Sequence, residues 1–280
     1  MMNKLLFMLL ACLFAPIAAY ANPDSTPIVV CYPGGPVNPK DANAAMDSML
    51  RVVERVGHWP AGSLNSVFTA NLDECKSLMD SKNPKFSITS LGIFLDQRER
   101  HHLLPVVQPT IKGRTTERYR VFVHMGKYTT LEELKGKLLG GTVLDDPAFI
   151  GKIVFAGKYD PASFFNLQPT NQAIRAIRSL DRAEYDAVLL NEQQYNGLPS
   201  LKLKNPIEAI FVSEEIPLMG MMADSKNTTA EERTRMGNAL AGMCDDAEGK
   251  KLCELFGVDA FKLVNPAQYE PMIKLWDKGN

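Results

Sequence analysis

The segment ERYRVFVHM (residues 117–125) carries a carboxylic acid and a phenol among valines. If the segment is a β-strand, Glu117, Tyr119 and Val121 share one face, because side chains alternate along a strand. A carboxylate and a phenol on one face can hold a hydroxyl group by hydrogen bonds at the mouth of a cleft. The same pattern fits a strand edge where polarity rises towards solvent, so both interpretations stay open.

A second polar candidate, Asn191, ends the apolar segment DAVLLN (residues 186–191), which we expect to be a strand. Ligands of α/β proteins bind beyond the carboxyl ends of such strands, and Asn191 lies at such an end. Its side-chain amide is therefore a candidate for the same polar site.

The segment DDPAFIGK (residues 145–152) follows LLGGTVL (residues 138–144), which we expect to be a strand, and it is expected to open a helix. Free N–H groups at a helix N-terminus bind anions, usually with help from Ser, Thr or Gly. The first turn here presents Ala148, Phe149 and Ile150 instead. Phe149 and Ile150 either face a ligand that is mostly hydrocarbon or pack into a core. The aspartate doublet before Pro147 is more typical of a turn and helix N-cap than of a metal or acid/base pair.

Catalytic motifs are missing from the sequence, which has no GxGxxG, Walker, HExxH or GxSxG pattern. His101 and His102 end a polar, helix-like segment, so we expect a solvated surface pair rather than a metal site. We therefore expect no enzyme activity, no cofactor and no metal. A formal net charge of −1 offers no basic face for nucleic acid, and this excludes that class of partner.

The N-terminus has the pattern of an export signal. Residues 1–21 combine a short basic start, an apolar stretch and an Ala-Tyr-Ala cleavage site before Asn22. Lipid attachment at Cys12 is the alternative, but the residues after Cys12 stay apolar, whereas a lipoprotein tether is usually polar. No later stretch reaches the ~18 apolar residues of a membrane span. The mature chain is expected to be exported.

Cleavage at this site leaves the cysteines Cys31, Cys75, Cys244 and Cys253. An even number of cysteines in an oxidising compartment favours disulfides. Among the possible pairings we prefer Cys31–Cys75 with Cys244–Cys253, since the latter closes a short helix–turn–helix tip. A zinc site is the alternative, but the sequence has no CxxC motif and no histidine near these cysteines.

Short apolar strands alternate with amphipathic helices along the chain. This alternation predicts an α/β fold with mainly parallel sheets. The composition changes at residues 108–117, and this stretch, with a return near residues 212–220, is a candidate crossing between two lobes.

The order of the segments resembles that of the periplasmic phosphate/phosphonate-type solute-binding proteins. The resemblance covers nearly all of residues 27–245 and rests on SLGIF, ERYRVFV, TTLEELKGKLLGGTVLDDPAFIG, DAVLLN and AIFVSEEIP. It implies a type II periplasmic-binding-protein fold, with two α/β lobes, a ligand cleft between them and a two-strand hinge. We expect lobe 1 at residues 22–115 plus 214–280 and lobe 2 at residues 116–213, and we expect the protein in the periplasm.

The sequence departs from this family where the family holds the oxygens of a phosphonate. Family members read Tyr-x-Ser in the tyrosine strand, but here Val121 stands at the serine position after Tyr119. They read Asp-Pro-x-Ser-Thr-Ser-Gly in the turn, but here Phe149 and Ile150 replace hydroxyl residues. A site without these hydroxyls and with the carboxylate of Glu117 would repel a phosphonate. The cleft therefore suits an apolar ligand with a neutral polar end.

A smaller group is similar in these departures, namely the periplasmic sterol-binding proteins of bacterial sterol-transport systems. This resemblance implies that Glu117, Tyr119 and Asn191 bind the hydroxyl of a sterol, C4-methylated sterols included. The partners it implies are an inner-membrane transporter of the resistance-nodulation-division type and a second periplasmic carrier, which together move the ligand between the inner and outer membranes. The alternative is a phosphate- or phosphonate-type anion receptor of an ATP-binding-cassette (ABC) importer. The expected ligand-binding residues are Glu117, Tyr119, Asn191, Val121, Phe149, Ile150, Leu91 and Tyr32.

Overall fold

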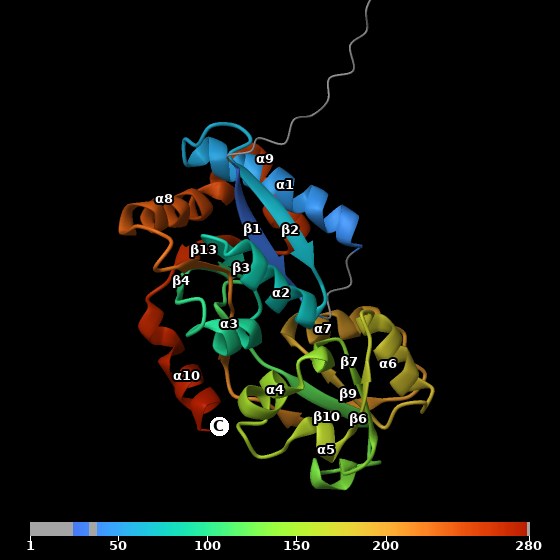
Figure 1. The fold of residues 1–280 in the computed structure, drawn as a ribbon. Helices are drawn as coiled ribbons and strands as arrows, with labels where there is room; N and C mark the ends of the chain where they lie inside the picture. The colour runs from blue at the N-terminus through green and yellow to red at the C-terminus, as the bar shows by residue number, and fades with distance from the viewer. Residues whose placement is uncertain (1–24, 34–37, 279–280) are drawn as a thin grey trace, which may run out of the picture.

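The computed structural model describes residues 25–33 and 38–278. The predicted signal peptide, residues 1–21, lies outside the described residues. The fold has two α/β lobes, each built around its own β-sheet and joined by a two-stranded ribbon (Figure 1). In the described part of the chain, no helix is long and apolar enough to cross a membrane.

Lobe 1 contains a six-stranded sheet in the order β13-β4-β12-β3-β1-β2. Helices cover this sheet, whereas the last helix of the chain, Glu270–Asp277, runs from lobe 1 towards lobe 2 (Figure 1). The strands are β1 (Thr26–Cys31), β2 (Leu64–Thr69), β3 (Phe86–Ile88), β4 (Leu103–Thr110), β12 (Met221–Asp224) and β13 (Ala260–Leu263). The helices are α1 (Pro39–Val56), α2 (Leu72–Lys82), α3 (Leu91–Gln97), α8 (Ala230–Ala241), α9 (Ala247–Phe256) and α10 (Glu270–Asp277).

Lobe 2 contains a five-stranded sheet in the order β10-β6-β9-β7-β8. Its helices are shorter than α1 of lobe 1. The strands are β6 (Arg120–His124), β7 (Leu138–Gly141), β8 (Asn166–Pro169), β9 (Ala187–Leu190) and β10 (Ile207–Val212). The helices are α4 (Pro147–Phe149), α5 (Pro161–Phe164), α6 (Ala173–Asp181) and α7 (Glu192–Gly197), and a π-helical turn at Ile150–Val154 continues α4.

The ribbon between the lobes pairs β5 (Thr116–Glu117) with β11 (Ile216–Pro217) in antiparallel fashion. Next to it, the backbone N–H of Tyr119 donates to the hydroxyl of Ser213 at 2.9 Å, and the N–H of Ser213 donates to the carbonyl of Tyr119 at 2.9 Å. The two chain crossings therefore run side by side. The lobe boundaries at 115/116 and 213/214 stay a prediction.

The sheets are mixed, which differs from the expected mainly parallel arrangement. β1 pairs in parallel with β2 and β3, and β7 pairs in parallel with β8 and β9. β6 and β12 each follow a ribbon strand, and each runs antiparallel to both of its neighbours. β6 is the first sheet strand after the crossing into lobe 2, and β12 is the first after the return into lobe 1. Each runs opposite to the parallel strands of its own sheet.

The cysteines form two disulfides in the structure, in the pairing that the sequence favours. Cys31 at the end of β1 is bonded to Cys75 in α2, with a Cα–Cα distance of 5.6 Å. Cys244 and Cys253 are bonded across the turn that leads into α9, with a Cα–Cα distance of 5.9 Å. Both Cα separations lie in the usual range for a disulfide.

Two local predictions were wrong. The stretch at residues 138–144 is not one strand, because β7 ends at Gly141, which packs against the carbonyl of Leu189, and a 3₁₀ turn follows. His101 is not solvated. It is 8% exposed, and its Nε2 lies 3.1 Å from Oδ1 of Asp80 on α2, which gives the imidazole a partner inside lobe 1.

Candidate functional site

A cluster of polar side chains lies where the ribbon meets lobe 2. Glu117 belongs to β5, and its Oε1 accepts a hydrogen bond of 3.0 Å from the hydroxyl of Tyr119. Tyr119 is 5% exposed and packs with Val121 in the large apolar core. Strand alternation is thus confirmed here, because these side chains share one side although the strand is interrupted between β5 and β6.

The environment of Glu117 raises the pKa of its carboxyl group from 4.5 to about 7. Burial is the main cause, and the negative charge of Glu192 adds to it. Hydrogen bonds from Tyr119 and from the backbone of Glu192 act in the opposite direction, because they favour the charged form. Near neutral pH the carboxyl group therefore exists in both protonation states, and it can accept or donate a hydrogen bond.

Two phenols face this carboxyl group. The pKa of Tyr119 is raised well above 10, first by burial and then by the charge of Glu117. Tyr32, at the end of β1 in lobe 1, is 48% exposed, yet the pKa of its phenol is also raised by burial and then by Glu117. Tyr32 is therefore partly in solvent, and its phenol is close enough to Glu117 to sense the charge of the carboxyl group. The structure brings these three predicted residues together.

Asn191 is the N-cap of α7 and directly precedes Glu192, whose charge acts on Glu117. Its Oδ1 accepts a hydrogen bond of 3.0 Å from the backbone N–H of Gln194, and its own backbone N–H donates to Oε1 of Gln194 at 3.2 Å. This capping box engages the side-chain oxygen, so the amide NH₂ of Asn191 is the group that remains suited to a ligand.

Both arginines that flank Tyr119 are already engaged, and Nη2 of Arg118 lies 3.5 Å from Oε1 of Glu215. Nη1 of Arg120 lies 2.7 Å from Oε2 of Glu192, and the guanidinium stacks over the ring of Tyr195 at 4.1 Å. Both members of the ion pair are mostly buried, at 13% and 19% exposed. Arg120 is therefore neutralised by Glu192 and held on the opposite face of the strand from Tyr119.

The start of α4 carries its own carboxylate. Asp146 is the N-cap, as the aspartate doublet predicts, and its Oδ1 accepts a hydrogen bond of 3.0 Å from the backbone N–H of Phe149. Pro147 has no N–H to offer. Burial raises the pKa of Asp146. An external anion at this helix start would therefore meet a bound carboxylate and few free N–H groups.

The apolar candidates are all buried at the contact between the lobes. Phe149 is 7% exposed, and its ring makes an edge contact with Tyr119 at 5.6 Å between centroids. Ile150 and Val121 have no exposed surface, and Leu91 of α3 is also buried. These residues belong to one apolar cluster that includes members of both lobes. In this arrangement the two lobes are in contact.

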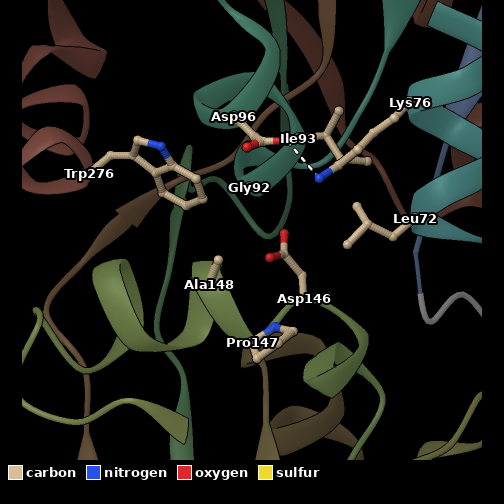
Figure 2. A pocket seen from close by; sticks show the side chains of 9 residues that line it. All are labelled: Leu72, Lys76, Gly92, Ile93, Asp96, Asp146, Pro147, Ala148 and Trp276. Atoms are coloured by element: carbon tan, nitrogen blue, oxygen red, sulfur yellow. Dashed lines mark ion pairs between the residues drawn. The ribbon is translucent and has the colours of Figure 1, made fainter. Parts of the chain in front are cut away.

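A cavity of about 160 Å³ lies between the lobes beside these residues (Figure 2). Pockets for drug-sized ligands usually enclose about 300–1,000 Å³, so this cavity holds only part of such a molecule. Its lining residues are Leu72, Lys76, Gly92, Ile93, Asp96, Asp146, Pro147, Ala148 and Trp276.

The sequence pattern did not point to several of these lining residues. Gly92 sits beside Leu91 in an apolar stretch, and only its close approach to lobe 2 makes it special. Trp276 lies in the last helix, far along the chain from the other candidates. Lys76 and Asp96 form an ion pair at 2.8 Å that joins α2 to α3. In the described residues, no group of three His, Cys, Asp or Glu is arranged to hold a metal ion.

A family model matches residues 37–269 and describes a phosphonate periplasmic substrate-binding protein of an ABC transporter. No curated protein matches the sequence significantly.

Solved structures share the fold at low sequence identity. A binding protein component of an ABC phosphonate transporter from Pseudomonas aeruginosa is 15% identical, with a TM-score of 0.67, over 90% of this chain and 86% of that one. PhnD1 from Prochlorococcus marinus in complex with methylphosphonate is 14% identical, with a TM-score of 0.62, over 92% and 98%. A Xanthomonas citri protein bound to ATP is 11% identical, with a TM-score of 0.69, over 90% and 96%.

These structural likenesses support the two-lobed type II fold, and the family model covers most of the chain. The family consists of receptors rather than enzymes, and its description implies a periplasmic location. The chain belongs to the family of phosphonate-type periplasmic substrate-binding proteins of ABC transporters.

Proposed function

We propose that this receptor binds a largely apolar molecule with a hydroxyl group at one end, and that a sterol is the ligand class. The observation that carries the proposal is the buried carboxyl group of Glu117, which is bonded to Tyr119 and has a pKa of about 7. A neutral hydroxyl can exchange hydrogen bonds with either form of this group. A phosphonate would add negative charge beside it.

The start of α4, where family members hold phosphonate oxygens, also favours a neutral ligand. At the start of α4 the carboxylate of Asp146 already accepts the N–H of Phe149, and the neighbouring cation Arg120 is paired with Glu192. A bound phosphonate would therefore have no unpaired cation from this strand and would lie near two carboxyl groups. Like charges at short range in a poorly solvated site are strongly unfavourable.

The relative magnitudes assign different roles to the two parts of the ligand. A hydrogen bond to a charged group contributes about 1.5–3 kcal/mol net. Burial of several hundred Å² of apolar ligand surface, at about 25 cal/mol per Å², gives on the order of 10 kcal/mol before the costs of association. The apolar body would set affinity, and Glu117, Tyr119 and Asn191 would set orientation. Because the interlobe cavity measures about 160 Å³, binding a whole sterol requires the lobes to separate first.

The test compares cholesterol with cholesteryl acetate, in which the hydroxyl is esterified, by calorimetric titration. Glu117→Ala should weaken cholesterol binding by about 1.5–3 kcal/mol and change the ester much less, because the ester has no donor to lose. Glu231→Ala, at an exposed position of α8, is the matched control. Equal affinity of wild type and Glu117→Ala for cholesterol would refute the proposal.

The second candidate is a phosphonate receptor that serves an ABC importer. The family description and the methylphosphonate complex of PhnD1 favour it, and they fit it better than a sterol. A rise in melting temperature with methylphosphonate, and none with cholesterol, would establish this candidate.

The two candidates also imply different partners. The family relationship suits an ABC importer, whereas a sterol ligand suits a transporter of the resistance-nodulation-division type and a second periplasmic carrier. Co-purification of the tagged receptor with its membrane partner would distinguish them.

A further inference from the structure

The polar cluster and the interlobe cavity lie on opposite sides of one close contact. Phe149 of lobe 2 touches Tyr119 with its ring, and its Cβ faces Gly92 of lobe 1. A Cβ added at Gly92 would lie 2.9 Å from Cβ of Phe149 and would overlap the carboxylate of Asp146. Gly92 and Asp146 also line the cavity. Phe149 against Gly92 therefore forms a partition between Glu117 and the cavity.

The cavity beyond this partition has apolar walls that face each other. Figure 2 shows the indole of Trp276 pointing into the space from one side and Leu72 pointing into it from the other. Pro147 and Ala148 form its floor in the same view. Of the charged lining residues, Lys76 and Asp96 pair with each other at 2.8 Å. The carboxylate of Asp146 also points into the space (Figure 2), and its Oδ1 accepts the backbone N–H of Phe149. The space is thus suited to an apolar group more than to a second charge.

The tryptophan is held in place from both lobes. Trp276 is 6% exposed, and the ammonium of Lys152, in the π-helical turn of lobe 2, lies 4.8 Å from the centre of its ring. In lobe 1, Arg98 pairs with Asp277 at 2.6 Å and fastens α10 to the end of α3. The indole is therefore a fixed wall between the lobes. It lies beyond residue 269, where the family match ends.

We propose that this cavity is an outer subsite that takes the alkyl end of the ligand, while Glu117 takes its hydroxyl end. The inference rests on the proposed function and adds Trp276 and Leu72 as residues that select ligands by length. A water-sized group occupies about 30 Å³, so a cavity of about 160 Å³ holds roughly five such groups. This is the size of a short branched alkyl chain, and it is too small for the four fused rings of a sterol. Separation of Phe149 from Gly92 would join the subsite to the polar cluster in one elongated cleft.

The test uses two steroid alcohols with the same hydroxyl and ring system, cholesterol and an androstane alcohol without the alkyl side chain. Trp276→Ala and Leu72→Ala should each weaken cholesterol binding about tenfold, equivalent to about 1.4 kcal/mol. Both variants should leave the affinity for the shorter alcohol unchanged. Trp276→Phe should recover most of the cholesterol affinity, because it keeps an aromatic wall.

A fluorescence arm uses the fact that the sequence holds two tryptophans. Trp59→Phe leaves Trp276 as the sole tryptophan, and Trp59 lies away from the cavity, where Arg235 stacks over its ring at 4.2 Å. Cholesterol should change the emission of Trp276 in this variant more than the shorter alcohol does, because both ligands separate the lobes but only the alkyl chain of cholesterol reaches the indole.

Three results would overturn the inference. Equal losses of affinity for both alcohols in Trp276→Ala would assign Trp276 a packing role. Unchanged affinity for both would place the alkyl end elsewhere. A wild type that binds neither alcohol would refute the proposed function and therefore this inference as well. This result is distinguishable from the first two, because those require a wild-type protein that binds both alcohols.

Discussion

Replacement of Glu117 by glutamine tests the site without any ligand. In the folded protein the pKa of Glu117 is raised from 4.5 to about 7, chiefly by burial. Between these two pH values the folded carboxyl group holds its proton while the unfolded one has lost it. The folded state therefore binds more protons, and a rise in pH favours unfolding. The stability that Glu117 contributes is fully present below pH 4.5 and is lost as the pH rises through about 7.

The difference between 4.5 and about 7, at about 1.4 kcal/mol per pH unit, sets an upper limit of about 3.5 kcal/mol for this effect. Glu117 keeps partial contact with solvent, so we expect about 2 kcal/mol. Glutamine resembles the protonated acid in shape and stays neutral. Glu117→Gln should thus exceed the wild type by less than about 1 kcal/mol at pH 5 and by about 2 kcal/mol at pH 8.5.

The assay is urea unfolding of ligand-free protein at these two pH values, with the free energy of unfolding extrapolated to water. Glu231→Gln, at an exposed position of α8, controls for the change from Glu to Gln as such. If wild type and Glu117→Gln show the same change of stability between pH 5 and 8.5, the carboxyl group of Glu117 is not buried as the structure has it, and the polar site loses its main feature.

Three further predictions concern closure, hydrogen bonding and redox state. Gly92→Leu should hold the lobes apart and raise the radius of gyration measured by X-ray scattering. Gly197→Leu is the control, because an added Cβ there meets no atom within 4 Å. Equal radii for the two variants would contradict the close contact between Gly92 and Phe149. Tyr119→Phe should weaken cholesterol binding by less than Glu117→Ala, since water can replace a neutral partner, and calorimetry that gives the reverse order would be a refutation. Thiol titration of the unfolded, unreduced mature protein should find essentially no free cysteine, and two or more free thiols would contradict both disulfides.

The local rules that depend on neighbouring residues predicted the correct structure. Alternation along a strand placed Tyr119 and Val121 on the buried side, where the core confirms them. The capping box of Thr229 and Glu232 is present at the start of α8. The N-cap role of Asp146 also follows from its position before a proline and a helix. In each case the interacting residues lie within a few positions of one another in the sequence, so the local pattern is enough to predict the interaction.

Features that depend on residues far apart in the chain could not be predicted from local sequence patterns. The raised pKa of Glu117 comes chiefly from burial, and the charge of Glu192 in lobe 2 adds to it. Gly92 matters only because α4 approaches it from the other lobe. Trp276 enters the interlobe space because the last helix packs against both lobes. His101 is buried where α2 packs beside it, with Nε2 3.1 Å from Oδ1 of Asp80. Such contacts exist only after the two lobes are assembled.

The most direct test of whether the cleft binds a hydroxyl-bearing apolar ligand is mass spectrometry of small molecules that co-purify with the protein from its native host. Calorimetry of the delipidated protein then measures rebinding. We expect a co-purified sterol, saturable rebinding of that sterol, and no heat of binding for methylphosphonate. A protein that carries no lipid and binds methylphosphonate tightly would contradict this expectation.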